Sequence, residues 1–204
     1  MRSLRLALIA LALLAAPVGA LAETAAAPLA VTSSDRVLGR ADAPVTVIEY
    51  ASFVCSHCAD WHTGVLPAFK ARFIDTGQVR LVFRDLPTPP VQIGARAAGI
   101  GRCAAPERFF DVAGALMTGQ AALMAGGPVA DWFAGAIARS GRTPAQIDAC
   151  LADPATIAGL RAEMAGATAA GVQGTPAFFV NGQAVTDTSL EGLSAAIRPL
   201  LPRP

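Results

Sequence analysis

The stretch Glu49-Tyr50-Ala51-Ser52-Phe53-Val54-Cys55-Ser56-His57-Cys58 takes the chain from a strand directly into a helix and places two cysteines at the junction. Residues 45–50 are largely apolar and β-branched, which is typical of a buried strand. Beyond the cysteines, large apolar residues recur at helical spacing: Trp61, Val65, Leu66, Phe69 and Phe73. We therefore expect Cys55 at a helix N-terminus and Cys58 one turn into the helix.

The position of Cys55 has chemical consequences. Unpaired backbone N–H groups and the positive end of the helix dipole stabilise a thiolate at a helix N-terminus. We expect Cys55 to be the reactive, partly exposed sulfur, with a pKa below that of a free cysteine, and Cys58 to close a disulfide with it. His57 between them can add positive charge or a hydrogen bond to the thiolate, which would make the disulfide more oxidising.

A C-x-x-C pair has other interpretations. It can be half of a zinc site, but a structural zinc site usually needs four ligands. The remaining candidates, Cys103, Cys150 and His62, form no second closely spaced pair. Two incidental buried cysteines would be unusual at a strand–helix junction, so we favour a redox-active pair.

A second motif lies far along the chain, in Gly174-Thr175-Pro176-Ala177-Phe178-Phe179-Val180-Asn181-Gly182. A Thr-Pro dipeptide opens an apolar strand there, and Asn-Gly leads into a second short strand over residues 183–185. Asn-Gly between apolar runs is a strong signal for a β-hairpin.

Together the two motifs resemble those of the thioredoxin superfamily, and within it the DsbA-like thiol-disulfide oxidoreductases. The resemblance runs from residue 45 to about residue 200, with the helical middle matching in outline. It implies that Pro176 is a cis-proline facing the dithiol, that Thr175 precedes it there, and that Glu49 is the acidic residue beneath the second cysteine. The family usually has Pro-His between the cysteines, so Ser-His in this chain leaves the redox potential open.

Glu49 lies in a strand that should be buried, where an acid is costly unless it has a task. We expect it to accept a proton from Cys58. The alternative is a carboxylate on an edge strand, paired with an arginine.

The first 22 residues have the pattern of a secretory signal peptide. Arg2 and Arg5 precede an apolar run, and Ala20-Leu21-Ala22 offers a small-x-small cleavage site. The run is short for a membrane span, although an uncleaved anchor is an alternative. We expect export to the periplasm, where disulfides persist, and a flexible tether over residues 23–36.

The composition fits one globular domain over residues 37–204. Of the 204 residues, 53 % are apolar and 15 % are charged, which provides ample material for a core. Loss of the signal would remove two arginines and leave 14 basic against 15 acidic residues, a net charge of −1. Neither nucleic acid nor an anionic membrane surface is indicated as a partner.

The expected fold class is α/β, a thioredoxin-like fold with an inserted all-helical block. A strand over residues 45–50, a crossover helix and a strand over residues 78–83 form a parallel β-α-β unit. The sequence pattern over residues 88–172 then predicts four or five short helices and no strand. The hairpin and a last helix, opening at a capping box in Thr188-Ser189-Leu190-Glu191, complete the fold.

Two residues of the first helix carry expectations of their own. Pro67 should kink that helix, because proline removes a helical hydrogen bond. His62 is expected at the surface, as a lone helical histidine usually is.

The other two cysteines lie in the helical block. Free cysteines beside a reactive disulfide can be scrambled by it, so we predict that Cys103 and Cys150 form a structural disulfide. Some DsbA-like proteins carry a second disulfide in this block, which agrees with the prediction. The alternative is two separate buried thiols.

These observations and the resemblance favour an exported oxidase that passes the Cys55–Cys58 disulfide to folding proteins with free thiols. No cofactor is expected, and the chain is expected to be a monomer. By resemblance, a quinone-linked membrane partner of the DsbB type would reoxidise it. The alternatives are a reductase or isomerase of the same fold and, from another class, a non-enzymatic module that holds copper or zinc. The isomerase ranks low, because little chain precedes Val45 to supply a dimerisation region.

Overall fold

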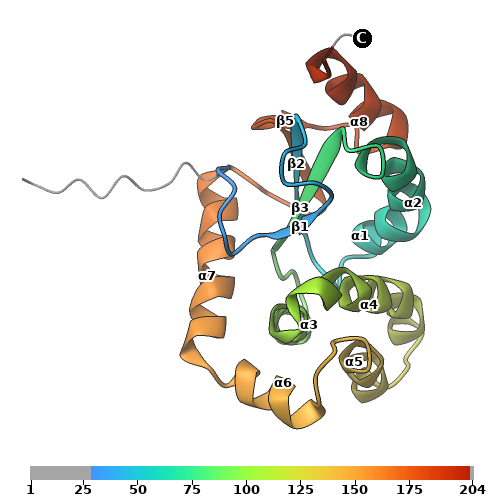
Figure 1. The fold of residues 1–204 in the computed structure, drawn as a ribbon. Helices are drawn as coiled ribbons and strands as arrows, with labels where there is room; N and C mark the ends of the chain where they lie inside the picture. Colours follow the sequence, from blue (N-terminus) through green and yellow to red (C-terminus); the bar gives the residue numbers. More distant parts are fainter. Residues whose placement is uncertain (1–28, 203–204) are drawn as a thin grey trace, which may run out of the picture.

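The structure is a computed structural model that describes residues 29–202, so the expected signal peptide lies outside the described residues. A five-stranded mixed sheet forms its centre, in the order β1-β3-β2-β4-β5 (Figure 1). The strands are β1 (Arg36–Leu38), β2 (Val45–Ala51), β3 (Val79–Asp85), β4 (Ala177–Val180) and β5 (Gln183–Val185). No helix within the described range is both long and apolar enough to cross a membrane.

Strand β2 is the middle strand of the sheet. It pairs in parallel with β3, as the β-α-β prediction requires, and antiparallel with β4, with Glu49 opposite both Phe83 and Phe178. The predicted hairpin joins β4 to β5, and the turn residues Asn181 and Gly182 have φ angles of 45° and 83°, as a type I′ turn needs. Since β2 has a neighbour on each side, Glu49 does not lie on an edge strand, and that alternative is wrong.

The helix after the cysteines is one continuous helical stretch in four pieces. It consists of α1 (Ser56–Asp60), a π-helical turn (Trp61–Val65), α2 (Leu66–Phe69) and a second π-helical turn (Lys70–Ile74). Pro67 lies in the first turn of α2, directly after the first π-helical turn. The π-helical turn just before it carries two buried side chains, Trp61 and His62.

The inserted block contains five α-helices and no strand, as predicted. They are α3 (Val91–Cys103), α4 (Phe109–Met124), α5 (Val129–Ile137), α6 (Pro144–Leu151) and α7 (Pro154–Ala169). Thr143 and Gln146 form a reciprocal capping box at α6, and Asp153 caps α7. In Figure 1, α7 runs along one side of the sheet, α1 and α2 lie on the other, and α3, α4 and α5 gather beyond one end of the strands.

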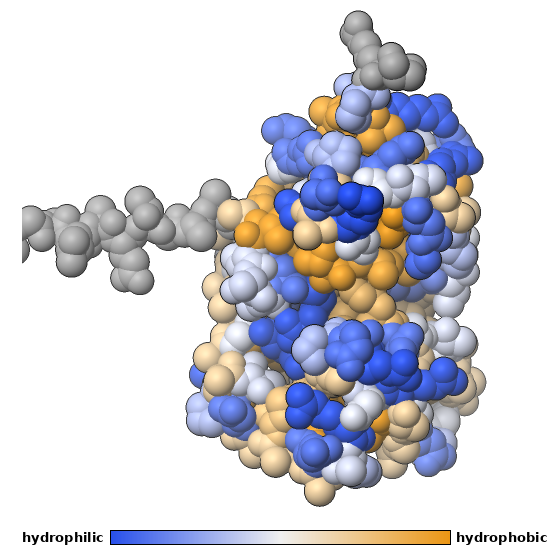
Figure 2. Space-filling view, viewed as in Figure 1, coloured by the Kyte–Doolittle hydropathy of each residue, from blue (hydrophilic) through white to orange (hydrophobic). Residues whose placement is uncertain are grey.

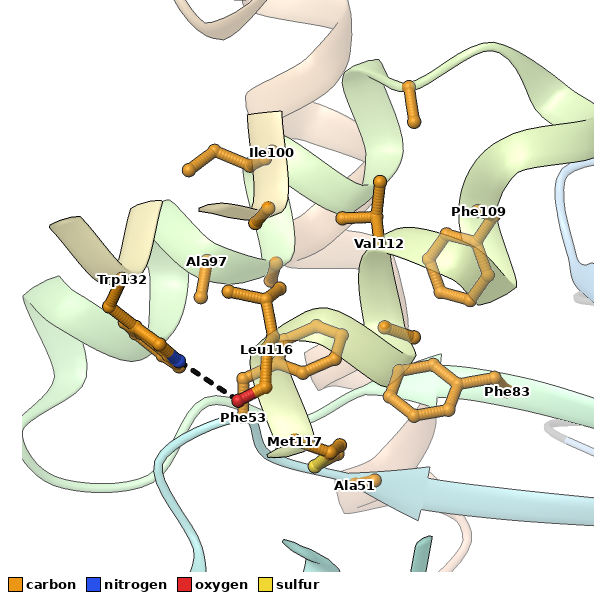
Figure 3. Close-up of a cluster of buried hydrophobic side chains, with 14 of the residues drawn as sticks. Ala51, Phe53, Phe83, Ala97, Ile100, Phe109, Val112, Leu116, Met117 and Trp132 are labelled. Atoms are coloured by element: carbon orange, nitrogen blue, oxygen red, sulfur yellow. Dashed lines mark hydrogen bonds between the residues drawn. The ribbon is translucent and has the colours of Figure 1, made fainter. Parts of the chain in front are cut away.

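The largest hydrophobic cluster fills the space between the sheet and α3, α4 and α5 (Figure 3). Phe109 and Trp132 are buried in it, and Phe110 and Phe133 pack against it partly buried. The indole N–H of Trp132 donates to the carbonyl of Leu116 at 2.9 Å, so this ring is buried without losing its hydrogen bond. Each such fully buried side chain contributes about 1.5–3 kcal/mol, which fixes the block against the end of the sheet.

The last helix, α8 (Leu190–Ile197), begins one residue later than predicted. Its N-cap is Ser189, whose hydroxyl accepts from the N–H of Gly192 at 3.1 Å. The capping box predicted from Thr188 to Glu191 is therefore wrong by one position. The carboxylate of Asp187 accepts the N–H of Ser189 at 3.0 Å, and this contact holds the serine in the capping position.

The described part of the expected tether, residues 29–36, packs against the domain. Leu29 and Val31 lie against a cluster on the α7 side of the sheet, and Figure 2 shows hydrophobic surface where the described chain begins. Asp35 forms two hydrogen bonds with Arg84 on β3, at 2.8 and 2.9 Å. Burial acts to raise the pKa of Asp35, but the contacts with Arg84 and the hydrogen bonds from Thr32 together outweigh it and hold that pKa below its usual value. For these residues a flexible tether is the wrong description.

Candidate active site

Cys55 is the N-cap residue of α1. Its backbone is extended, with φ −89° and ψ 119°, and its carbonyl accepts the N–H groups of Cys58 and Ala59 at 3.1 and 3.2 Å. The side chain is half-buried, and the structure shows both cysteines of the pair as free thiols. The buried strand β2 ends at Ala51, so the sulfur lies just beyond the carboxyl end of this strand, against the helical block.

Cys58 lies one turn further and is completely buried. Its sulfur is 3.5 Å from the backbone N–H of Ser52. Burial raises the pKa of the Cys58 thiol far above its ordinary value, and the nearby Glu49 carboxylate adds to that rise. The N–H of Ser52 acts in the opposite direction and is outweighed. Cys58 therefore holds its proton firmly, and it can react as a thiolate only if a neighbouring group takes that proton.

Thr175 and Pro176 lie beside the dithiol, as the family resemblance implies. The peptide bond between them is cis, and the thiol of Cys55 donates to the carbonyl of Thr175 at 3.2 Å. Strand β4 places them there, because Ala177 pairs with Tyr50 near the end of β2. Two segments far apart in the sequence thus form the site together.

His57 lies on the exposed side of the first turn of α1. Within residues 29–202, no hydrogen bond joins its ring to either cysteine, so its influence on the pair is limited to its charge. The expected hydrogen bond from His57 to the Cys55 thiolate is therefore not among the contacts of the described residues.

His62 is buried, and the prediction of a surface histidine is wrong. Its Nε2 is 3.0 Å from both carboxylate oxygens of Glu49, and the two side chains are 3 % and 0 % exposed. The residue lies four positions after Cys58, so it faces the sheet on the same side of the helix as that buried cysteine. This spacing was the signal in the sequence that could have identified it.

Gln120 is a second residue that sequence reasoning missed. It is buried on α4, and its side-chain amide donates to the carbonyls of Phe53 and Cys55 at 2.7 and 3.1 Å. On the other side of the loop, the hydroxyl of Ser52 accepts from the backbone N–H of Thr88 at 3.1 Å. These contacts hold the segment that carries Cys55.

Cys103 and Cys150 are joined by a disulfide, the expected pairing, with their Cα atoms 5.8 Å apart. It links α3 to α6 within the helical block. No group of three or more His, Cys, Asp or Glu side chains in the described part of the chain is placed to hold a metal ion.

Comparison with known proteins gives this geometry a context. Residues 31–198 match a family model described as Thioredoxin. A Rickettsia bellii protein named "Putative protein-disulfide oxidoreductase" is 29 % identical over 172 residues, which are 82 % of this chain and 64 % of that protein. This chain thus spans less than two thirds of that relative's length.

Two solved structures share the fold. Alpha-DsbA1 of Wolbachia pipientis superposes with a TM-score of 0.73 at 24 % identity, over 84 % of this chain and 93 % of that one. Oxidised BdbD of Bacillus subtilis gives a TM-score of 0.70 at 20 % identity, over 82 % and 92 %. The thioredoxin-like fold with its helical insertion is therefore confirmed, and the chain belongs to the thioredoxin family.

Proposed function

We propose that this chain is a thiol-disulfide oxidoreductase, and that it acts as an oxidase which passes the Cys55–Cys58 disulfide to folding proteins. The observation that carries the proposal is the contrast between the two sulfurs. Cys55 is half-buried at the start of α1, whereas Cys58 is completely buried behind it. A substrate thiolate can approach the first sulfur and not the second, so the order of exchange is defined.

The exchange has two steps. A substrate thiolate attacks the sulfur of Cys55, forms a mixed disulfide and breaks the bond to Cys58, which leaves as a thiolate and takes up a proton. A second substrate thiolate then attacks the mixed disulfide and releases Cys55. Two electrons pass from the substrate to the chain, and no cofactor enters the reaction.

Thr175 and Pro176 are proposed to line the cleft beside Cys55. The contact between the Thr175 carbonyl and the Cys55 thiol supports this role. We infer that the ring of Pro176 also keeps a metal ion from bridging the two cysteines.

The proposal that the chain oxidises its substrates is supported by features that stabilise the reduced, dithiol form of the chain. A helix N-terminus stabilises a thiolate, and His57 can add positive charge beside it. Export to the periplasm is proposed from the expected signal over residues 1–22, and a DsbB-type membrane protein is proposed to reoxidise the dithiol. The name of the Rickettsia bellii relative supports the same reaction class.

Equilibration of the chain with glutathione buffers, followed by alkylation and mass spectrometry, tests the function. We expect a redox potential of the Cys55–Cys58 pair well above the roughly −270 mV of thioredoxin. We also expect rapid oxidation of a reduced two-cysteine peptide. Cys55→Ser should lose both the equilibrium with glutathione and the oxidation of the peptide. A potential near that of thioredoxin would assign a reductase instead. Stoichiometric copper or zinc in the freshly purified protein would assign a metal-binding module.

A further inference from the structure

The buried pair of Glu49 and His62 borders a cavity at the surface. The cavity has a volume of about 280 Å³ and lies between the helix that follows β2 and α4. Its lining includes His62, Thr63 and Lys70 from the first of these, and Asp111 and Thr118 from α4. Thr63, Asp111 and Thr118 are exposed, so the cavity is open to solvent, with His62 on its inner wall.

The imidazole ring of His62 has one nitrogen in the core. Nε2 faces Glu49, and the ring is held edge-on by Phe83 and Trp61, with centroids 5.7 and 5.3 Å away. Within residues 29–202, Nδ1 makes no hydrogen bond, and it is not among the completely buried atoms that lack a partner. The second nitrogen is therefore accessible from the cavity.

The proposed exchange requires a path by which protons pass between solvent and the buried Cys58 and Glu49. Cys58 has no exposed surface, and neither has Glu49, so solvent reaches neither the thiol nor the carboxylate directly. A carboxylate that exchanges a proton with Cys58 must recover or release that proton in every cycle. His62 is the residue that touches both Glu49 and the cavity.

We propose that His62 acts on the dithiol reaction through Glu49, as a positioning residue. Its ring carries protons between Glu49 and the solvent in this cavity. The inference rests on the proposed function. When the Cys58 thiolate leaves, Nε2 of His62 passes its proton to the Glu49 carboxylate, which passes it on to Cys58, and water in the cavity supplies a proton to Nδ1. When the dithiol is reoxidised, each proton moves in the opposite direction. The ring thus returns to its first tautomer at the end of every cycle.

Few other charged groups face the ring. Glu49 lies on β2 and Cys58 on α1, while Lys70 and Asp111 line the cavity. Lys70 forms an ion pair with Asp75 at 2.5 Å, and Asp111 forms one with Arg108 at 2.9 Å. The neighbour on β3, Phe83, does not titrate. A change in the pH profile on replacing His62 can therefore be assigned to the Glu49–His62 path.

The test follows reaction of the reduced chain with oxidised glutathione, quenched with acid and read by mass spectrometry. Glutathionylation of Cys55 is the first step, and attack of Cys58 on the mixed disulfide is the second. In His62→Gln the amide still donates to Glu49 but cannot carry a proton. We expect an unchanged first step and a second step slowed by about 10²-fold, at the lower end of the usual contribution of acid–base catalysis.

Two further variants separate the relay from packing. In His62→Ala, added imidazole should restore the second step by entering the cavity, whereas in His62→Gln it should not. In Glu49→Gln, adding His62→Gln should slow the reaction no further, because both residues act on one path. Asp60→Asn, which removes an exposed carboxylate from the same helix, is the control and should match the unmodified chain in both steps.

Several results would overturn the relay. One is a second step in His62→Gln with the rate and pH profile of the unmodified chain. Another is a slowing of both steps together with a lower melting temperature and no imidazole rescue, since that would assign His62 to packing. If the unmodified chain itself fails to react with oxidised glutathione, the proposed function fails, and the two failures are thereby distinguished.

Discussion

The thiol of Cys55 donates to the carbonyl of Thr175 at 3.2 Å, although 120 positions separate the two residues in the sequence. Formation of the Cys55–Cys58 disulfide removes the donating proton, so this bond can exist only in the dithiol. The reduced chain therefore holds a contact across the cleft that the oxidised chain lacks.

The two sulfurs should differ strongly in reactivity. In the reduced chain we expect iodoacetamide to modify Cys55 at least about tenfold faster than Cys58, because Cys58 is buried and protonated. Peptide mapping of the alkylated chain measures both rates. Cys58→Ala should accumulate a mixed disulfide with substrate, and equal labelling of the two sulfurs would contradict this assignment.

Gln120 should stabilise the fold through the loop that it holds. Gln120→Ala leaves the buried carbonyl of Phe53 without its donor, which should lower the free energy of unfolding by about 1–3 kcal/mol. Urea denaturation measures the change as a lower midpoint at an unaltered slope. Gln92→Ala, on the exposed side of α3, is the matched control, and an equal effect there would argue against the loop contact.

The Cys103–Cys150 disulfide should contribute to stability and not to the reaction. It closes a loop with a sequence separation of 47 residues, which corresponds to about 4 kcal/mol on the chain-entropy model. Replacing both cysteines by alanine should lower the melting temperature and keep most of the oxidase activity. The oxidised chain, denatured without reductant, should show no free thiol. Two free thiols would mean that this pair is unbonded, and lost activity at unchanged stability would indicate a relay to Cys55.

Asp85 should make the fold less stable as pH rises. Burial and the nearby charge of Glu163 raise the pKa of this carboxyl to about 8, although Arg102 lies 3.8 Å away. Because the folded-state pKa lies above the unfolded value, the stabilising contribution is complete below about pH 4 and is lost as pH rises through about 8. Asp85→Asn should flatten this fall in urea unfolding measured from pH 4 to pH 9. Parallel curves for the two chains would contradict it.

The parts of the fold that local patterns specify were predictable. The strand–helix junction at Cys55, the Asn181-Gly182 hairpin and the caps at Thr143 and Asp153 each depend on residues a few positions apart. Their geometry is set by hydrogen bonds within the same short segment, so the sequence alone carries the information.

Contacts between distant segments were not predictable in this way. Gln120 reaches the carbonyl of Phe53 across 67 positions, and Arg84 meets Asp35 across 49. Nothing near either residue marks its partner, because the pairing arises only when the helical block and β3 are in place. The contact of His62 with Glu49 is of the same kind, since 13 positions separate the two residues and they meet only when the helix packs on the sheet.

The central position of β2 has a consequence for how the chain is made. One neighbour, β3, follows β2 closely, but the other, β4, begins at Ala177, after the whole helical block. While the chain is being synthesised from its N-terminus, all four cysteines emerge before the segment that closes over the first pair. The growing chain thus already contains Cys103 and Cys150 while the Cys55–Cys58 pair still lacks the Thr175-Pro176 segment, which belongs to about the last seventh of the sequence.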